Sequence, residues 1–275
     1  MKKLVVLFVL SVLSISAYAG IMIHPKFLFF DDRTKVAEII LINSDPVVSS
    51  NYRVSLSYKK QNQDGSYTEI PVESEDSSSM PKDSAIPFLR YSPRAAFLSP
   101  QKSQIVRVLK RLPEGVEPGD YIAYITFTEV LMEKPLTKQV EKDTFSVKIT
   151  PIPSFSIPIL VRYQNKEQPQ VSLEILNTEH KGTTPYITLR ISKDKKSFVR
   201  GDISVWLKDE RLGFIKGKYL LPANDSVDIS IPLTRNGEVL TWEDLKGKKL
   251  KVLFTEPGED KINKKDVIAK EEIKF

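Results

Sequence analysis

The chain is 275 residues long, contains no cysteine and carries a formal net charge of +6. This length allows one large domain or two of medium size, and the lack of thiols excludes disulfides and zinc sites built from cysteine. The basic residues are scattered among acidic ones and form no basic stripe with interleaved aromatic residues, a pattern that does not favour nucleic-acid binding.

The first 19 residues have the pattern of a secretory signal peptide. Lys2 and Lys3 precede an apolar run from Leu4 to Ile15, and Ala17-Tyr18-Ala19 supplies the small residues of a cleavage site. The apolar run is short for a membrane span. We therefore expect residues 1–19 to be removed on export.

Strand signals dominate the chain after this segment, whereas helix signals are nearly missing. Asp64-Gly65 marks a hairpin turn, and residues 74–84 form a polar stretch that we expect to be an exposed loop. The spacing of the runs is typical of an immunoglobulin-like sandwich. The expected strands are Ile21–Phe30, Val36–Asn43, Tyr52–Lys59, Ile86–Tyr91 with a continuation to Leu98, Ser103–Lys110 and Tyr121–Val130.

The stretch EKDTFSVKITPIPSFSIPILVRY, residues 141–163, keeps one apolar face in a single period-2 register from Phe145 to Val161. Fully extended, that run would reach roughly 56 Å at about 3.3 Å per residue, whereas strands usually reach about 17–20 Å. One interpretation is a core-facing last strand. The other is an apolar edge that is left open for a partner, because an unpartnered edge of this kind invites aggregation.

Three prolines interrupt the hydrogen-bonding capacity of this stretch. Pro151 and Pro153 have the same parity and remove donors from one edge, and Pro158 removes a donor from the opposite edge. We expect Thr144–Thr150 to close the first sandwich as an edge strand, and Phe155–Arg162 to pair again in the second domain.

A second series of strand signals follows, with turns at KDERLG and TRNGEV. The sequence therefore predicts an all-β fold of two immunoglobulin-like β-sandwich domains in tandem, at residues 20–153 and 154–275. The expected strands are Gln170–Asn177, Pro185–Ser192, Asp202–Leu207, Gly213–Leu221, Val227–Leu233, Leu250–Glu256 and Val267–Phe275.

Catalytic motifs do not stand out. His24 and His180 are far apart and lack neighbours at metal-ligand spacing, and the chain has no nucleophile elbow or phosphate-binding glycine loop. We expect no enzyme activity, no cofactor and no metal, which leaves a binding module.

Four blocks of the sequence stand out by their order and spacing: IHPKFLFFDDRTKVAEIILIN, YSPRAAFLSPQKSQIVRVL, GDYIAYITFTEV and SIPILVRY. Together they resemble a family of periplasmic pilus (fimbrial) assembly chaperones. The resemblance implies that the first domain donates an edge strand to a pilus subunit that lacks its last strand. It also implies delivery to an outer-membrane usher in the periplasm, without nucleotide, and self-association of the free protein through the same edge. The donated side chains would be Phe145, Val147, Ile149 and Ile152.

The resemblance further implies an interdomain network of Asp120, Arg162 and Glu256, which would fix the angle between the domains. The positions where relatives anchor a subunit's terminal carboxylate fall on Phe27 and Pro158, neither of which binds a carboxylate. Other basic residues are then the anchor candidates, and these are Arg107, Lys26 and Lys148. The alternative function is a secreted structural or adhesive immunoglobulin-like protein of a surface fibre.

Overall fold

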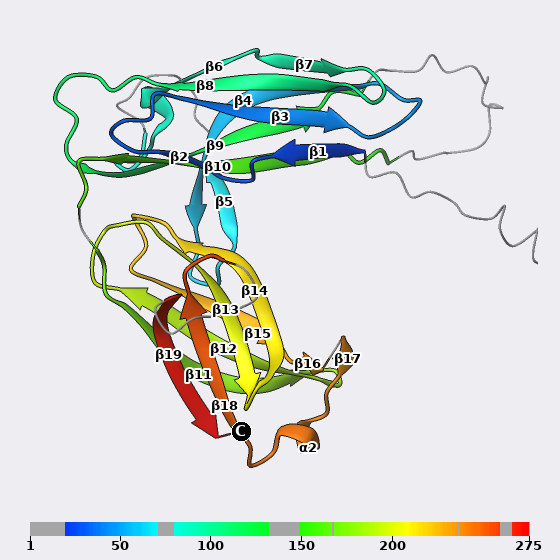
Figure 1. Cartoon of the computed structure of the whole chain (residues 1–275), viewed down its shortest axis with the longest axis vertical. Helices are drawn as coiled ribbons and strands as arrows, with labels where there is room; N and C mark the ends of the chain where they lie inside the picture. The colour runs from blue at the N-terminus through cyan, green and yellow to red at the C-terminus, as the bar shows by residue number, and fades with distance from the viewer. Residues whose placement is uncertain are drawn as a thin grey trace, which may run out of the picture.

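The computed structural model describes residues 20–70, 80–131, 149–166, 168–235, 237–258 and 266–274. In Figure 1 these residues form two β-sandwich domains, one coloured from blue to green and the other from green to red. The prediction of an all-β fold with two sandwiches in tandem is confirmed. None of the helices among the described residues has the length and apolar character needed to cross a membrane.

The first domain consists of two sheets. Sheet A has the order β1 (Ile21–His24), β3 (Val36–Asn43), β8 (Ser103–Lys110), β6 (Leu89–Ser92). Sheet B has the order β2 (Leu28–Phe30), β10 (Ser154–Tyr163), β9 (Gly119–Glu129), β4 (Ser50–Gln61), β5 (Tyr67–Ile70), and β7 (Ala95–Leu98) also pairs with β4. Counted along the chain, these are the A-B-E-D and G-F-C orders of immunoglobulin-like sandwiches.

The core of this domain follows the alternation of its strands. Ile39 and Leu41 of β3 are fully buried between the sheets, as are Phe30 of β2 and Phe127 of β9. The residues between them on each strand point outward, as the period of two requires. A short 3-10 helix, η2 (Ile86–Phe88), leads into β6 and adds to the same core.

Two strand predictions in the first domain are corrected by the pairing. The expected strand Ile21–Phe30 is split into β1, which pairs with β3 in sheet A, and β2, which pairs in parallel with β10 in sheet B. The second correction concerns β10, which was expected in the second domain. It pairs with β9 along its full length, and Ile157, Ile159 and Val161 pack into the first core. The domain boundary after residue 153 is therefore too early, because Ser154–Tyr163 completes sheet B.

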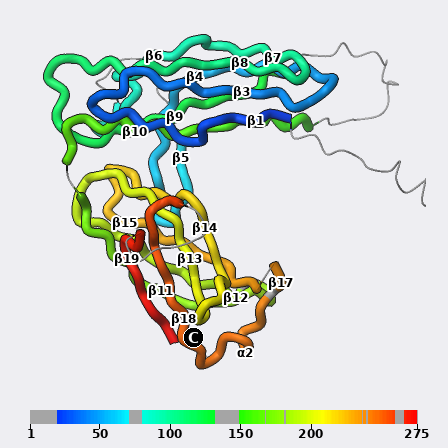
Figure 2. The backbone as a smooth tube through the Cα atoms, viewed as in Figure 1, coloured from blue at the N-terminus to red at the C-terminus, as the bar shows by residue number. Residues whose placement is uncertain are grey.

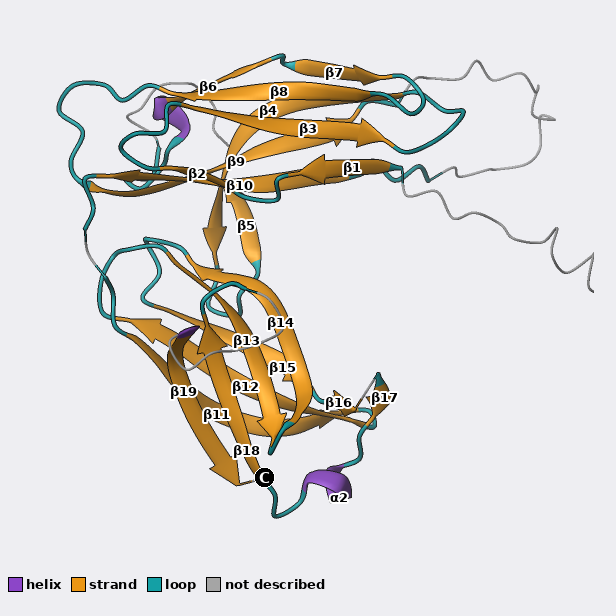
Figure 3. Ribbon diagram, in the orientation of Figure 1, coloured by secondary structure: helices purple, strands orange, loops and turns teal. Residues whose placement is uncertain are grey.

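The second domain is built in the same way. One sheet has the order β11 (Val171–Lys181), β12 (Thr184–Lys193), β15 (Ser226–Pro232), and the other has the order β14 (Glu210–Leu220), β13 (Val199–Leu207), β18 (Lys249–Thr255), β19 (Val267–Lys274). A two-stranded ribbon, β16 (Thr234–Arg235) with β17 (Glu238–Val239), and a one-turn helix, α2 (Trp242–Leu245), lie near the end of the chain (Figure 3).

Candidate functional site

The outer edge of β10 is open over its N-terminal half. On one side β10 pairs with β9 from Ser154 to Tyr163. On the other side β2 covers only Ile159 to Val161. Within the described part of the chain, no strand pairs with the outer edge of β10 between Ser154 and Pro158. This edge is a template for a further strand.

The prolines determine which edge of this segment can pair. The carbonyl of Pro153 accepts a hydrogen bond of 3.1 Å from the backbone N–H of Glu129 in β9, so odd-numbered residues direct their backbone groups towards β9. Pro151 and Pro153 therefore remove donors on the β9 side, which explains why the ladder begins only at Ser154. By the same alternation, Pro158 faces the outer edge and leaves the β9 ladder intact.

Apolar side chains are exposed beside this open edge. Ile149 is 87% exposed, Ile152 is 56% exposed and Phe155 is 39% exposed. Phe155 lies opposite the fully buried Phe127 in the register with β9. The apolar core is therefore exposed to solvent at Phe155. Phe145 and Val147, predicted to share the face of Ile149, lie outside the described residues.

Asp120 and Arg162 are brought together at the junction of the two domains. The carboxylate of Asp120 accepts hydrogen bonds from Nε and Nη2 of Arg162 at 2.8 and 2.7 Å. It also accepts one from the backbone N–H of Phe198 in the second domain, at 2.8 Å. The Asp120 side chain has no exposed surface. Its hydrogen bonds raise the pKa of Arg162 above the ordinary value, so the guanidinium stays protonated at neutral pH.

Glu256, the third residue expected in this network, is placed beside it. It lines an interdomain cavity of about 520 Å³ together with Arg162, but among the described residues the ion pair of Arg162 is with Asp120. Three aromatic residues, Phe27, Phe29 and Phe198, line part of the cavity wall. Phe27 stacks on Phe198 with ring centroids 5.6 Å apart, and the guanidinium of Arg200 lies 4.9 Å from the centre of the Phe27 ring.

The hairpin of β4 and β5 forms a second contact between the domains, which the sequence did not predict. The side-chain amide of Gln61 donates to the carbonyl of Tyr219 at 2.8 Å and accepts from the N–H of Leu221 at 3.1 Å. The side-chain amide of Gln63 donates to Asp228 on β15 at 3.0 Å. Figure 2 shows this hairpin extending from the first domain into the second. Only the Asp-Gly turn could be predicted from the sequence, because a glutamine carries no sign of its partner in local pattern.

Lys193 is a second buried charged residue beside this junction. Its ammonium donates to the carbonyls of Ser197 and Leu221 at 2.6 and 2.7 Å, and to Pro222 at 3.3 Å. Burial lowers the pKa of Lys193 to about 8, and the charges of nearby carboxylates, among them Asp120, oppose that shift. Lys193 therefore remains mostly protonated at pH 7 and ties three loop carbonyls together.

The carboxylate-anchor candidates lie apart from one another. Arg107 is on the outward face of sheet A, where it is paired with Glu38 at 2.8 Å. Lys26 is exposed between β1 and β2, and Lys148 lies outside the described residues. Of the two positions where relatives hold their anchors, Phe27 is in the interdomain aromatic stack and Pro158 is buried in β10.

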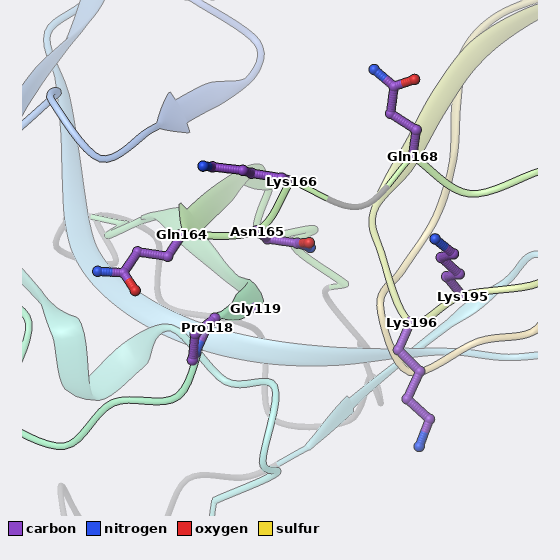
Figure 4. A pocket seen from close by; sticks show the side chains of 8 residues that line it. All are labelled: Pro118, Gly119, Gln164, Asn165, Lys166, Gln168, Lys195 and Lys196. Carbon is purple, nitrogen blue, oxygen red and sulfur yellow. The ribbon is translucent and has the colours of Figure 1, made fainter.

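A second, more polar cavity of about 670 Å³ opens at the linker between the domains. In Figure 4, Lys195 and Lys196 on its wall point in opposite directions, and Lys166 points towards a third side. Because the three ammonium groups diverge, they do not form a single anion site. Among the described residues there is also no cluster of three or more metal-ligating side chains.

No protein-family model matches the sequence, and no curated protein matches it. Solved structures of similar fold are found at low identity. One is the complex of SafA pilin with the SafB chaperone of Salmonella enterica, with 9% identity over 93% of this chain and 96% of that chain, and a TM-score of 0.47. Another is the CsuC–CsuE chaperone–tip subunit pre-assembly complex of Acinetobacter baumannii, with 14% identity over 93% and 97%, and a TM-score of 0.45. A third is the CupB2 chaperone of Pseudomonas aeruginosa, with 7% identity over 92% and 100%, and a TM-score of 0.44.

Proposed function

We propose that this protein is a periplasmic chaperone for subunits of a pilus or a similar surface fibre. It binds a subunit by adding the outer edge of β10, together with the residues before it, as a strand to the subunit's incomplete sheet, and it delivers the subunit to an outer-membrane usher. The observation that supports the proposal is the outer edge of β10. This edge is open and apolar, and up to Ser156 no proline occupies a position whose N–H group would face outward.

Main-chain pairing would supply the affinity of this complex. Pro151 and Pro153 lose donors only on the β9 side, so an extended segment keeps outward N–H groups at Thr150, Ile152 and Ser154. Ser156 adds a fourth outward donor before Pro158. A subunit strand can therefore pair with this edge without meeting a missing donor, whereas β9 receives no backbone N–H from Pro151 or Pro153.

Apolar side chains would supply the register. Phe155 lies on the face that continues the core of the sandwich, and an extended segment before it would place Ile149 on the same face; both side chains are exposed in the free protein. A partner that lacks a strand has a groove for alternate side chains of this kind, and a slip by one residue would turn them away from it. The exposed edge would otherwise be an aggregation site.

The junction of Asp120, Arg162 and Phe198 would fix the angle between the domains. A carboxylate that is shared by a strand of the first domain and a backbone N–H of the second permits a narrow range of orientations. Buried ion pairs are weak contributors to net stability, so orientation is the role that we assign to it. The bound subunit would then rest against a surface of defined shape.

The test uses proline scanning of the edge. Ser154→Pro removes an outward donor and leaves the β9 ladder intact, so we expect a folded protein that no longer captures subunits from a periplasmic extract. Ser154→Ala is the matched control and should capture subunits like the original. Phe155→Pro removes a donor on the β9 side and should instead lower stability. Unchanged capture by a folded Ser154→Pro variant would refute strand donation from this edge.

A further inference from the structure

The outward face of sheet A is unusually apolar for an antiparallel sheet that faces solvent. Its outward positions alternate with the buried ones on β1, β3 and β8. Ile40 and Ile42 are half-buried there, and four more exposed apolar side chains belong to the same face. These are Met22 at 51%, Val36 at 50%, Leu109 at 43% and Ile105 at 42%.

These side chains lie in cross-strand pairs, which separates them from the single exposed hydrophobic residues of any protein surface. Across the strands, Met22 lies opposite Ile42, and Ile40 lies opposite Ile105. Val36 lies opposite Leu109. Cross-strand neighbours of this kind have Cβ atoms about 5 Å apart, so the three pairs make up one patch over β1, β3 and β8 that is apolar on both sides of a single charged pair.

One ion pair divides this patch. Glu38 and Arg107 lie opposite each other on β3 and β8, with Oε1 and Nε 2.8 Å apart. Ile40 and Ile105 flank the ion pair on one side, and Val36 and Leu109 flank it on the other. Along β3 and β8, the outward face therefore carries an apolar pair, a charged pair and a second apolar pair. The acid of the charged pair is on β3 and the base is on β8.

This arrangement is complementary to itself. If two copies place these faces together, with a two-fold axis along the strands between β3 and β8, then β3 of one copy lies over β8 of the other. Glu38 then faces the Arg107 of the second copy, and Ile40 faces the Ile105 of that copy. A two-fold contact must be self-complementary in this sense, and stacked sheets pack about 10 Å apart.

The second domain leaves this face free. Contacts of the first domain with the second come from sheet B, from its hairpin and from the segment before β2, through residues such as Asp120, Gln61 and Phe27. In Figure 1 the second domain lies below the first domain, on the side of β10, β1 and the hairpin of β4 and β5, while β8 and β6 of sheet A lie near the top of the first domain. We infer that the outward face of sheet A is a homodimer interface in which two copies pack face to face around the Glu38–Arg107 pair.

The size of the face sets the expected strength. Two strands of eight residues and two of four, about 4.8 Å apart and rising about 3.3 Å per residue, cover roughly 380 Å². A standard interface buries about 800 Å² per partner. The dimer should therefore be weak and depend on protein concentration, and it does not use the open edge of β10.

Charge reversal tests this inference by sedimentation velocity on the purified protein, up to millimolar concentration. Glu38→Arg gives two bases and Arg107→Glu gives two acids at the centre, so each variant alone should lose at least about tenfold in dimer affinity. An equimolar mixture of the two variants should restore the dimer, because the arginine introduced on β3 of one then faces the glutamate introduced on β8 of the other. Both native side chains are largely exposed, so the fold should tolerate these changes, and circular dichroism checks this.

Each other outcome overturns the inference. An original protein that stays monomeric at millimolar concentration has no such interface. A dimer that survives both single reversals, but is lost in Ile149→Ser, associates through the strand edge instead. A mixture that fails to restore association shows that Glu38 and Arg107 do not face each other between copies. Phe97→Ser is the matched control, since Phe97 is 57% exposed on sheet B and its loss should leave the dimer unchanged.

Discussion

Replacing Asp120 by alanine is the sharpest test of the interdomain junction. The carboxylate accepts three hydrogen bonds, two from Arg162 and one from the N–H of Phe198. Without it, a guanidinium and a backbone N–H both lose their partner inside the junction. The perturbation therefore acts on both domains at once, although the substituted residue belongs to β9 alone.

The cost follows from the burial of the groups left behind. Breaking a buried ion pair by removing one partner costs about 3–5 kcal/mol, but the Arg162 side chain is 32% exposed, so water recovers part of this. An unsatisfied buried N–H costs about 1–3 kcal/mol. The two costs share one site and do not add fully. We expect Asp120→Ala to lower the free energy of unfolding by about 3 kcal/mol.

The assay is urea unfolding, followed by tryptophan fluorescence and by circular dichroism, because a two-domain chain can unfold in two steps. Glu38→Ala is the matched control, since it breaks an equally short ion pair whose side chains are 45% and 64% exposed. Such a surface pair contributes about 0–1 kcal/mol. If Asp120→Ala costs no more than Glu38→Ala, the junction is not held by this carboxylate.

Four further changes test the rest of the structure. Arg162→Ala should alter the small-angle scattering profile, and an unchanged profile would count against its role in orienting the domains. Gln61→Ala leaves a buried N–H and a carbonyl without partners and should cost about 1–3 kcal/mol in urea unfolding. Because the pKa of Lys193 is about 8 when folded and 10.5 when unfolded, the unfolded chain binds more protons between these values, and the contribution of Lys193 to stability rises with pH in that window. The stability difference between the original and Lys193→Met should therefore change in favour of the original from pH 8 to 10.5, and a flat difference would contradict this. Gly201→Ala places a Cβ 2.5 Å from a buried aromatic ring and 2.6 Å from a carbonyl, so it should lower the free energy of unfolding by about 1–3 kcal/mol or more. Gly20→Ala is its control, because the added Cβ meets nothing within 4 Å and stability should not change.

Local pattern was enough to find most of the strands. Val36–Asn43 and Ser103–Lys110 were predicted with the bounds that the structure gives them, because each alternates regularly and ends at polar turn residues. Asp64-Gly65 was predicted as a hairpin turn, and Gly65 has a φ of +76°, which glycine adopts without strain.

The sequence did not predict correctly which sheet or domain a strand joins, because that depends on the strands it pairs with. The run Ile21–Phe30 is apolar throughout most of its length, and nothing in its pattern shows that β1 and β2 pair in different sheets. Ser154–Tyr163 was assigned to the second domain because Pro151 and Pro153 look like a break. They interrupt only the pairing with β9 upstream of Ser154, while the chain continues in the same sheet.

The same distinction between local pattern and tertiary packing applies to the candidate site. The sequence by itself determined an apolar stretch whose prolines remove donors from one edge at 151 and 153 and from the other at 158, since donor parity is a property of the strand alone. It could not say which edge meets β9. Only the tertiary structure decided this, by pairing the carbonyl of Pro153 with Glu129 and leaving the opposite edge, from Ser154 to Pro158, without a partner strand among the described residues. It likewise joined Asp120 to a backbone N–H of the second domain 78 residues away, because contacts between distant segments depend on how the sandwiches pack and not on local pattern.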